Sequence, residues 1–364
     1  MPNILAVGTV LPDNILTQRE VQQFAHNIYG EAFHDIDRLV SVFDNAEIEQ
    51  RHFCVPLDWF GSSKTFEEKN DLYISNAISL SSAAIELALT NAGLAHADID
   101  YLIFVSTTGI STPSIDAQLI QRLPFRRNIK RLPIWGLGCA GGAASLSRAM
   151  DIARANRSAR VLVVITELCG LTFLRNDLSK SALIATSLFA DGSAAVVVGG
   201  DDVPAGPRAA ALISSRTTTM DDSLDVMGWD IGNDGFKVMI SRDIPAIVRT
   251  FMRDSIEAFL EEEGLAIGDI DHFIAHPGGA KVLQAYIDSL DLPPEKLDHT
   301  RSVLRTCGNM SACSVIFVLE KFLEEIASRR DPQPDTEYGL LGALGPGFAS
   351  ELVLLRWQSP AEST

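Results

Sequence analysis

The chain contains the segment Gly93-Leu94-Ala95-His96-Ala97-Asp98-Ile99-Asp100-Tyr101-Leu102-Ile103 and, much later, a second copy, Gly264-Leu265-Ala266-Ile267-Gly268-Asp269-Ile270-Asp271-His272-Phe273-Ile274. Seven of the eleven positions are identical. In each copy we predict the end of a helix followed by the start of a buried strand. The interval between the copies is far longer than the period of a solenoid repeat, so it indicates two similar halves within one compact unit.

A second match follows in the same order and at nearly the same interval. The segment from Arg131 to Cys139 corresponds to the segment from Arg301 to Asn309, and each leads into a helix start made of small residues. If a pseudo-twofold axis relates the halves, we expect Cys139 and Asn309 to lie close together near that axis. We place the halves at residues 1–200 and 209–364. The linker is predicted at Gly199–Arg208, where Gly, Asp and Pro cluster.

Short apolar runs alternate with helical patterns along the chain. The apolar runs predict buried strands at Ile4–Val10, Tyr101–Val105, Leu132–Gly136, Val161–Thr166, Ala194–Val198, Ala211–Ser214, His272–Ala275, Gly339–Ala343 and Leu352–Trp357. Helical spacing and good helix formers predict helices at Asn76–Ala92, Gly141–Ala155, Ile244–Glu263, Ala280–Leu290 and Ala312–Ser328. Strands that alternate with helices indicate an α/β fold in which helices pack on sheets.

The composition restricts the classes of partner. The chain has 364 residues, a net charge of −17 and a pI of about 4.8, which disfavours nucleic acid and anionic membranes as partners. We see no signal peptide and no apolar run approaching the ~20 residues that span a bilayer, so we expect no integral membrane segment. The five cysteines form no CxxC pair and no disulfide framework, which favours a reducing cytoplasm.

Cys139 lies in Trp135-Gly136-Leu137-Gly138-Cys139-Ala140-Gly141-Gly142-Ala143-Ala144-Ser145-Leu146, where a strand runs into a glycine-flanked turn and then into a helix. This arrangement presents a side chain at a helix N-terminus, and the glycines permit close approach of a substrate. A helix N-terminus favours negative charge, so we expect a lowered thiol pKa and a reactive thiolate. Backbone N–H groups there can also hold an oxyanion. The alternative interpretation is a buried, inert thiol.

Two further residues have the context of a site. His276 ends a buried strand in Phe273-Ile274-Ala275-His276-Pro277-Gly278-Gly279, and strand ends are where open α/β folds place their sites. Asn309 lies in Thr306-Cys307-Gly308-Asn309-Met310-Ser311-Ala312, at the point that matches Cys139 in the other half. A local hydrogen bond for the histidine and a helix N-cap for the asparagine are the alternatives.

The three side chains fit one chemistry. A thiolate can attack a thioester and hold the acyl group, while an imidazole pairs with it and then donates to a developing oxyanion. A carboxamide donates a second hydrogen bond, so the pair can stabilise the enolate that remains when a malonyl thioester loses CO2. A cysteine protease would instead use the asparagine to orient the histidine, and spacing alone does not separate the two.

Four motifs occur in order: Gly138-Cys139, His276-Pro277-Gly278-Gly279, Gly308-Asn309-Met310-Ser311 and Leu344-Gly345-Pro346-Gly347-Phe348. In these motifs the chain resembles, nearly end to end, the type III polyketide synthases of the chalcone/stilbene synthase family. Ketoacyl carrier-protein synthases share Cys, His and Asn but typically lack the last loop. Thiolases use a second catalytic cysteine near the C-terminus, and none follows Cys313.

The resemblance implies a thiolase-like, five-layered αβαβα fold and a homodimer. It implies an acyl-CoA starter and a malonyl-CoA extender, with coenzyme A thioesters as substrates and no metal or bound redox cofactor. It implies catalytic roles for Cys139, His276 and Asn309. It also implies contacts to substrate from Thr107, Thr112, Cys169, Thr172, Phe189, Val238, Ser311, Gly345, Pro346, Gly347, Phe348 and Arg38.

Departures from the plant enzymes indicate the substrate. Phe189 matches the first of two gatekeeper phenylalanines, but Val238 replaces the second, and Cys169 stands where threonine is common. Smaller and more apolar walls favour a long acyl chain. Thr112 replaces a methionine that reaches the partner's cavity. Of the basic positions that contact coenzyme A, only Arg38 is kept, since Ser41 and Asn45 replace the others. A basic cluster between Arg122 and Arg131 is predicted to be a solvated surface.

The pattern is most similar to bacterial alkylpyrone synthases. We therefore expect a long-chain fatty acyl-CoA to load on Cys139, to be extended iteratively by decarboxylative Claisen condensation, and to cyclise to an alkylpyrone or alkylresorcinol. The first alternative is a condensing enzyme like ketoacyl-ACP synthase III. The second is a binding protein that kept the fold and lost activity. Starter length, the number of extensions and the mode of ring closure stay open at this point.

Overall fold

The computed structural model describes residues 1–30, 32–206, 209–329 and 336–358, and its strands form a large mixed sheet. The N-terminal half supplies, in spatial order, β5 (Lys130–Ile134), β4 (Tyr101–Val105), β6 (Arg160–Leu168), β7 (Asp191–Gly199) and β1 (Asn3–Val10). The C-terminal half continues with β8 (Ala210–Thr219), β13 (Ala349–Gln358), β12 (Thr336–Gly345) and β11 (His272–Ala275). The half-sheets meet where Asn3 and Ile4 pair with Ala211 and Ala210.

The two half-sheets repeat one topology. β4 runs parallel to β6, as β11 runs parallel to β12. β6 is antiparallel to β7, as β12 is antiparallel to β13. Within the part of the chain that the structure describes, β5 is the strand of the N-terminal half without a counterpart in the other half-sheet.

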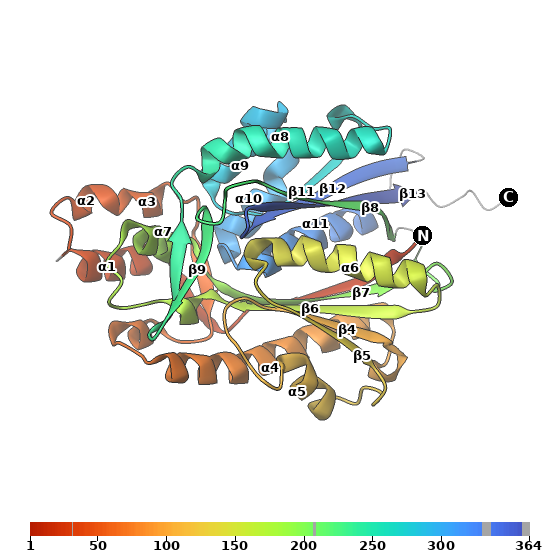
Figure 1. Cartoon of the computed structure of the whole chain (residues 1–364), viewed down its shortest axis with the longest axis horizontal. Coiled ribbons are helices and arrows are strands. Elements are labelled where there is room, and N and C mark those ends of the chain that lie inside the picture. Colours follow the sequence, from red (N-terminus) through yellow and green to blue (C-terminus); the bar gives the residue numbers. More distant parts are fainter. Residues whose placement is uncertain (31, 207–208, 330–335, 359–364) are drawn as a thin grey trace.

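Helices complete a five-layered arrangement, which Figure 1 shows edge-on. α4 (Phe66–Ala92) and α5 (Ile115–Arg122) cover the outer face of the N-terminal sheet. α6 (Gly141–Ala155) and α11 (Ser314–Ser328) lie between the two sheets, and α8 (Ile244–Glu262) and α9 (Ala280–Leu290) form the opposite outer layer. The predicted α/β fold, with five αβαβα layers from two similar halves, is confirmed.

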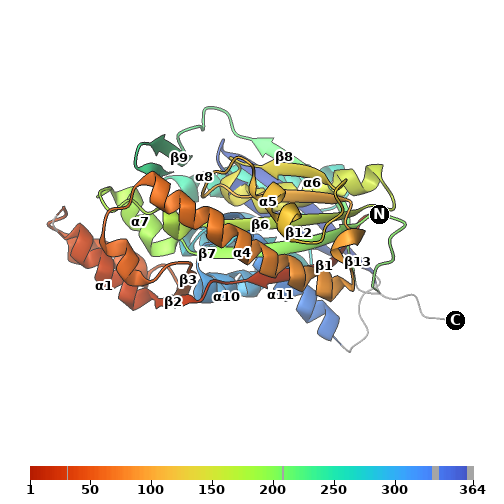
Figure 2. The ribbon, with the colours of Figure 1, turned by 90° about the horizontal axis from the view of Figure 1, so that it is seen from below.

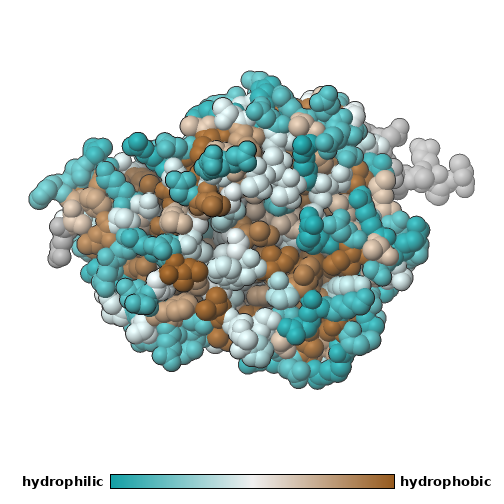
Figure 3. All heavy atoms as spheres, viewed as in Figure 1, coloured by the Kyte–Doolittle hydropathy of each residue, from teal (hydrophilic) through white to brown (hydrophobic). Residues whose placement is uncertain are grey.

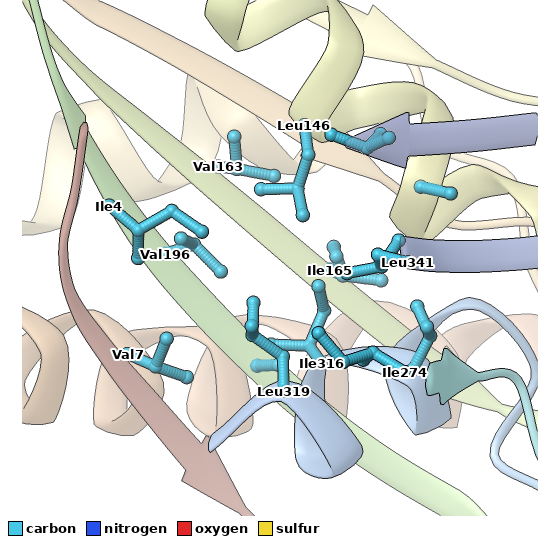
Figure 4. Close-up of a cluster of buried hydrophobic side chains, with 14 of the residues drawn as sticks. Ile4, Val7, Leu146, Val163, Ile165, Val196, Ile274, Ile316, Leu319 and Leu341 are labelled. Atoms are coloured by element: carbon cyan, nitrogen blue, oxygen red, sulfur yellow. The ribbon is translucent and has the colours of Figure 1, made fainter. Parts of the chain in front are cut away.

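The central layer contains the largest apolar core. Leu146 from α6 and Ile316 and Leu319 from α11 pack between Val163 and Val196 on one sheet and Leu341 on the other (Figure 4). Because helices cover both faces of each sheet, central strands read as continuous apolar runs. Every residue of β7 is buried, for example. This core holds α6 and α11 in place, and the candidate site lies at the starts of these two helices.

The first repeated segment has the same structural role in both halves. The Asp98 carboxylate accepts the Ala95 N–H at 2.8 Å, as Asp269 accepts the Ala266 N–H at 2.8 Å. Two residues later, Asp100 accepts a backbone N–H from the start of β6 at 2.8 Å, and Asp271 accepts one from the start of β12 at 2.9 Å. The identical aspartates therefore cap a short turn and attach the parallel neighbour strand, which explains their place in the repeat.

The second repeated segment differs from our prediction. Arg131–Cys139 contains β5, whereas the matching Arg301–Asn309 falls largely in α10 (Asp298–Cys307). The sequence match pairs Gly141, where α6 begins, with Ser311, but α11 begins only at Ser314. Cys139 and Asn309 are therefore not equivalent points. An alignment on the helix starts would pair Gly141 with Ser314, so the alignment on sequence identity is displaced by three residues.

Several elements were not predicted. They are α1 (Gln18–Tyr29), α2 (Ile36–Leu39), α3 (Ser41–Asp44), α5, α7 (Lys180–Leu188), α10, β2 (Asn14–Thr17), β3 (Gln50–Phe53), β9 (Met227–Gly232) and β10 (Gly235–Ile240). α1, β2 and β3 gather at one end of the molecule, beside the start of α4 (Figure 2). The predicted linker lies between β7 and β8, although its Pro207 and Arg208 are outside the described residues.

α4 is long and apolar enough to cross a membrane by length and composition, contrary to the expectation that no segment approaches that length. Its buried residues, among them Ala77, Ala84 and Ile85, pack in the core on the outer face of the N-terminal sheet. Thr65 and Glu68 form a capping box at its start, and Gly93 ends it in the left-handed conformation. In this fold the helix is therefore a packed layer of the sheet.

Candidate active site

Cys139 lies in the turn between β5 and α6, within the short 3₁₀ turn Gly138–Ala140. Gly138 has φ of 46°, and a β-carbon there would lie 2.7 Å from Pro346, so only glycine fits. A β-carbon at Gly142 would lie 2.4 Å from the Ala312 carbonyl oxygen. This close approach brings the start of α6 against the Ser311–Cys313 turn, so the two halves meet beside the thiol.

Desolvation raises the pKa of Cys139 to about 12, and the nearby Glu167 carboxylate acts in the same direction, whereas the Ser311 side chain opposes the shift. We expected the helix N-terminus to lower this pKa. Burial has the larger effect and acts in the opposite direction, so the structure favours a neutral thiol at neutral pH.

Glu167 is a fully buried carboxylate at the centre of this region. It accepts the Thr107 backbone N–H at 3.0 Å, the Thr108 hydroxyl at 2.9 Å and the Ser311 hydroxyl at 3.4 Å. Desolvation raises its pKa to about 7, although these hydrogen bonds favour the charged form. Thr107 also accepts the Gly138 N–H at 3.1 Å through its hydroxyl, so one network supports the cysteine turn from both halves.

Asn309 is held in place on both sides of its carboxamide. Its Oδ1 accepts the Ser311 N–H at 2.9 Å, and its Nδ2 donates to the Gly278 carbonyl at 3.2 Å. Its backbone forms a bridge with Phe189 of the other half. The alternative N-cap role is therefore replaced by a link between the asparagine motif and the His276-Pro277-Gly278 loop. Among the hydrogen bonds of the described residues, the amide uses one of its two hydrogens, so the other can serve a ligand.

His276 follows β11 and is 5% exposed. Neither ring nitrogen has a hydrogen-bond partner among the described residues, although both are buried. Burial alone lowers the pKa of His276 to about 4, so the ring is neutral at physiological pH. A buried histidine normally satisfies at least one nitrogen locally. The free ring indicates a position whose partner arrives with a ligand.

The three segments that carry the predicted catalytic residues are linked. Gly142, three residues after Cys139, lies against the Ala312 carbonyl; the Ser311 N–H donates to Asn309, and Asn309 donates to Gly278, two residues after His276. Gly345 and Pro346 lie against the Leu137–Ala140 turn, since a β-carbon at Gly345 would lie 2.4 Å from the Leu137 oxygen.

Two neighbours in the last motif have different positions. Gly347 has φ of 110° and accepts the Ser223 hydroxyl through its carbonyl oxygen at 3.0 Å. Phe348 is fully buried and packs on Phe251 in the outer core of the C-terminal half, with ring centroids 6.0 Å apart. The Phe348 side chain therefore belongs to that core, and its contact with substrate stays a prediction.

Four of the predicted substrate contacts line a single apolar cavity. Cys169, Thr172, Phe189 and Val238 surround it together with side chains from β2, α1, β3, α7 and the 3₁₀ turn Leu57–Gly61: Leu16, Val21, Phe24, Arg51, Phe53, Leu57, Phe60, Ala182, Ala185 and Thr186. We refer to it as the acyl chamber. It encloses about 620 Å³ of empty space, part of it open to solvent.

Arg38 and Thr112 lie away from this region. Arg38 is 73% exposed on α2 and pairs with Asp35. Thr112 is exposed and precedes Pro113 in a cis peptide bond. Neither residue lines the acyl chamber. Within the described residues, no group of three His, Cys, Asp or Glu side chains could hold a metal ion.

Sequence reasoning missed Glu167 and Arg51 as parts of the site. Glu167 was detectable as a lone carboxylate at the end of an otherwise apolar strand. Arg51 is 1% exposed, lines the chamber and donates to the carbonyl oxygens of Thr186 and Phe189 at 2.7 and 2.9 Å. Its signal was weak because β3 was not predicted.

The fold and the cysteine turn define a condensing acyltransferase with a thiolase-like architecture. The N-terminal domain of chalcone and stilbene synthases matches residues 1–202, and their C-terminal domain matches residues 211–358. The chain therefore belongs to the chalcone and stilbene synthase family. It is a type III polyketide synthase, a condensing enzyme that extends an acyl chain with malonyl-CoA.

Relatives cover nearly the whole chain. A Bacillus subtilis (strain 168) protein named "Putative chalcone synthase" is 42% identical over 99% of this chain and 100% of its own length. The 1,3,6,8-tetrahydroxynaphthalene synthase of Streptomyces peucetius subsp. caesius is 38% identical over 98% of this chain and 93% of its own. The crystal structure of the Streptomyces coelicolor A3(2) 1,3,6,8-tetrahydroxynaphthalene synthase superposes with a TM-score of 0.91 at 27% identity, covering 98% of this chain and 99% of that one.

Proposed function

We propose that the enzyme loads a long-chain fatty acyl-CoA on Cys139 and extends it iteratively to an alkylpyrone or alkylresorcinol. In the loading step the Cys139 sulfur, on giving up its proton, attacks the thioester carbonyl carbon. The tetrahedral intermediate then collapses, the acyl–sulfur bond to coenzyme A breaks, and coenzyme A leaves as a thiol after taking a proton. The resting thiol is neutral, so its deprotonation accompanies substrate binding, with the unpartnered His276 as the acceptor.

Extension uses the other two side chains. Malonyl-CoA loses CO2, and the electron pair of the broken C–C bond forms an enolate of the remaining thioester. We assign the stabilisation of the enolate oxygen to hydrogen bonds from the His276 ring and the Asn309 amide. The enolate carbon attacks the acyl group, a C–C bond forms, and the Cys139 sulfur is released. Both donors have unused hydrogen-bonding capacity among the described residues, which supports this assignment.

The single observation that supports a long-chain starter is the acyl chamber. Its walls are predominantly aliphatic and aromatic, and Cys169 is one of its lining residues. Each methylene buried in such a space contributes about 0.8 kcal/mol. An alkyl chain bound to Cys139 has no comparable apolar space elsewhere among the described cavities.

A homodimer, a cytoplasmic location and the absence of a bound cofactor other than coenzyme A thioesters complete the proposal. Apolar patches interrupt the polar surface on the face that carries the β9–β10 hairpin (Figure 3). Exposed large apolar residues include Ile110, Leu132, Trp135, Leu224 and Ile231, and the exposed Thr112 lies two residues from Ile110. Such a group of residues suits a self-association surface. Arg38 keeps its proposed contact with the phosphates of coenzyme A.

The decisive experiment is incubation of the purified enzyme with malonyl-CoA and acyl-CoA starters of increasing length, with products identified by mass. Long-chain triketide or tetraketide pyrones or resorcinols, formed without carrier protein, would support the proposal. Products from short starters alone would refute the long-chain assignment. A strict requirement for malonyl-ACP would instead favour a ketoacyl-ACP synthase III-like enzyme.

A further inference from the structure

A second cavity lies beside the acyl chamber and has the opposite character. Four cationic side chains line it, Lys64, Lys69, Arg175 and Lys237, with the Trp59 ring next to them. It encloses about 740 Å³ of empty space, part of it open to solvent. We refer to it as the cationic pocket. Two carboxylates, Asp177 and Asp234, also line it, so its formal charge is four minus two, or +2, in a chain whose net charge is −17.

The cations of this pocket are not held in ion pairs. In the regions of the chain that the structure describes, none of the four forms an ion pair with a carboxylate. Lys69 is 4% exposed and donates to the backbone carbonyl of Asp234, and Lys64 lies over the Trp59 ring with its Nζ 5.8 Å from the centroid. Buried charges are ordinarily held in ion pairs, so four cations without one in a cavity wall indicate a site for an anion.

The two cavities share a wall. Phe60, Phe173, Leu174 and Asp177 line both. Phe60 and Phe173 pack with Phe24 in a trio whose ring centroids lie 5.8 to 6.3 Å apart. These rings separate the apolar chamber from the cationic pocket. A rotation of one ring would join an apolar channel to a cluster of positive charge.

We propose that the cationic pocket binds a carboxylate carried at the far end of an alkyl chain that occupies the acyl chamber. This inference rests on the proposed function, because the chamber is taken to hold an acyl chain. Apolar walls that lead to unpaired cations match an amphiphile with one anionic end. Such a ligand is either a free fatty acid, lying with its methyl end toward Cys139, or a starter whose terminal carbon is a carboxylate.

Binding of a free amphiphile tests the site without catalysis. In the Cys139→Ala enzyme, calorimetry with laurate and with 1-dodecanol compares the same chain with and without charge. We expect the Cys139→Ala enzyme, the parent in this test, to bind laurate on the order of tenfold more tightly than dodecanol. This preference should disappear when Lys64→Met and Arg175→Met are added to it. Arg249→Met, which removes an exposed charge from α8, is the matched control and should keep the preference. Equal binding of laurate and dodecanol by the parent would overturn the proposal.

A second measurement identifies the source of the carboxylate. The otherwise unaltered enzyme is assayed with lauroyl-CoA and with dodecanedioyl-CoA as starters, and with free laurate as an inhibitor. If Lys64→Met/Arg175→Met turns over dodecanedioyl-CoA more slowly but lauroyl-CoA at an unchanged rate, the site binds the carboxylate of a starter. Competitive inhibition by laurate that weakens about tenfold in the same variant assigns it to a free fatty acid. If the variant changes neither, the proposal is wrong.

The proposed function and the assignment of the cationic pocket fail in different ways. If lauroyl-CoA does not acylate the wild-type enzyme at all, the proposed function fails. If lauroyl-CoA loads and is extended, yet no carboxylate depends on Lys64 or Arg175, only the assignment of the cationic pocket fails. Melting temperatures of the variants are measured alongside, and the Lys64→Gln/Arg175→Gln pair repeats the test with polar replacements.

Discussion

Replacing Val238 with phenylalanine should shorten the starter that the enzyme accepts. Val238 is half-buried on β10 and lines the acyl chamber, as does Phe236 two residues earlier on the same face of the hairpin. A phenyl ring at this position would fill space that an alkyl chain otherwise occupies. If it displaces about three methylene groups at about 0.8 kcal/mol each, the loss is ~2.4 kcal/mol, or roughly 60-fold in kcat/KM for the longest starters.

The assay is a series of acyl-CoA starters from hexanoyl to palmitoyl, with kcat/KM measured for each. Met239→Phe is the matched control, because Met239 is the next residue on β10, faces the other side of the hairpin and does not line the chamber. Cys169→Phe should reproduce the Val238→Phe profile from a different wall. If palmitoyl-CoA keeps its rank in both Val238→Phe and Cys169→Phe, the chamber does not hold the acyl chain and the reasoning is wrong.

Three further outcomes are expected. Cys139→Ala should show no mass increase after incubation with lauroyl-CoA, and an acylated protein would contradict the nucleophile assignment. Asn309→Ala should lower malonyl-CoA decarboxylation by about 10²- to 10³-fold while acyl loading stays within a few-fold, as measured by CO2 release and intact mass. The pKa of Glu167 is about 7 in the folded protein and 4.5 for the free side chain, so the native state binds this proton more tightly than the unfolded state. The free energy of unfolding should therefore fall as the pH rises from about 4.5 to about 7. Chemical denaturation should therefore show Glu167→Gln gaining roughly 3 kcal/mol relative to wild type between pH 4 and pH 8, and the exposed Glu263→Gln should show no such gain.

The repeat predicted the architecture because its shared residues have the same structural role in both halves. Asp98 and Asp269 cap equivalent turns, and Asp100 and Asp271 attach equivalent strands, so both copies retained them. The buried strands were detectable because helices cover both faces of the sheets, which demands continuous apolar runs. The presence of two similar halves could therefore be predicted from the sequence.

Other features depend on contacts that no local pattern encodes. β9 and β10 form a two-stranded sheet apart from the main one, and their position is fixed by Trp229, whose ring N–H donates to the Thr107 carbonyl at 3.0 Å. The pKa of Cys139 is another example. A helix N-terminus is readable in the sequence, but the desolvation that raises this pKa depends on how deeply the folded chain buries the thiol.

The three-residue shift between the halves explains how one repeated turn supports two different tasks. When Gly141 and Ser314, the starts of α6 and α11, are aligned, the structural counterpart of Cys139 is Ala312, which is fully buried and carries no reactive group. The polar residues of the C-terminal half instead precede that position. Asn309 binds the loop that follows His276, while Ser311, at φ of 49°, donates its hydroxyl to Glu167. We therefore infer that the shift, rather than the residue types alone, keeps the nucleophile in one half and its oxyanion donors in the other.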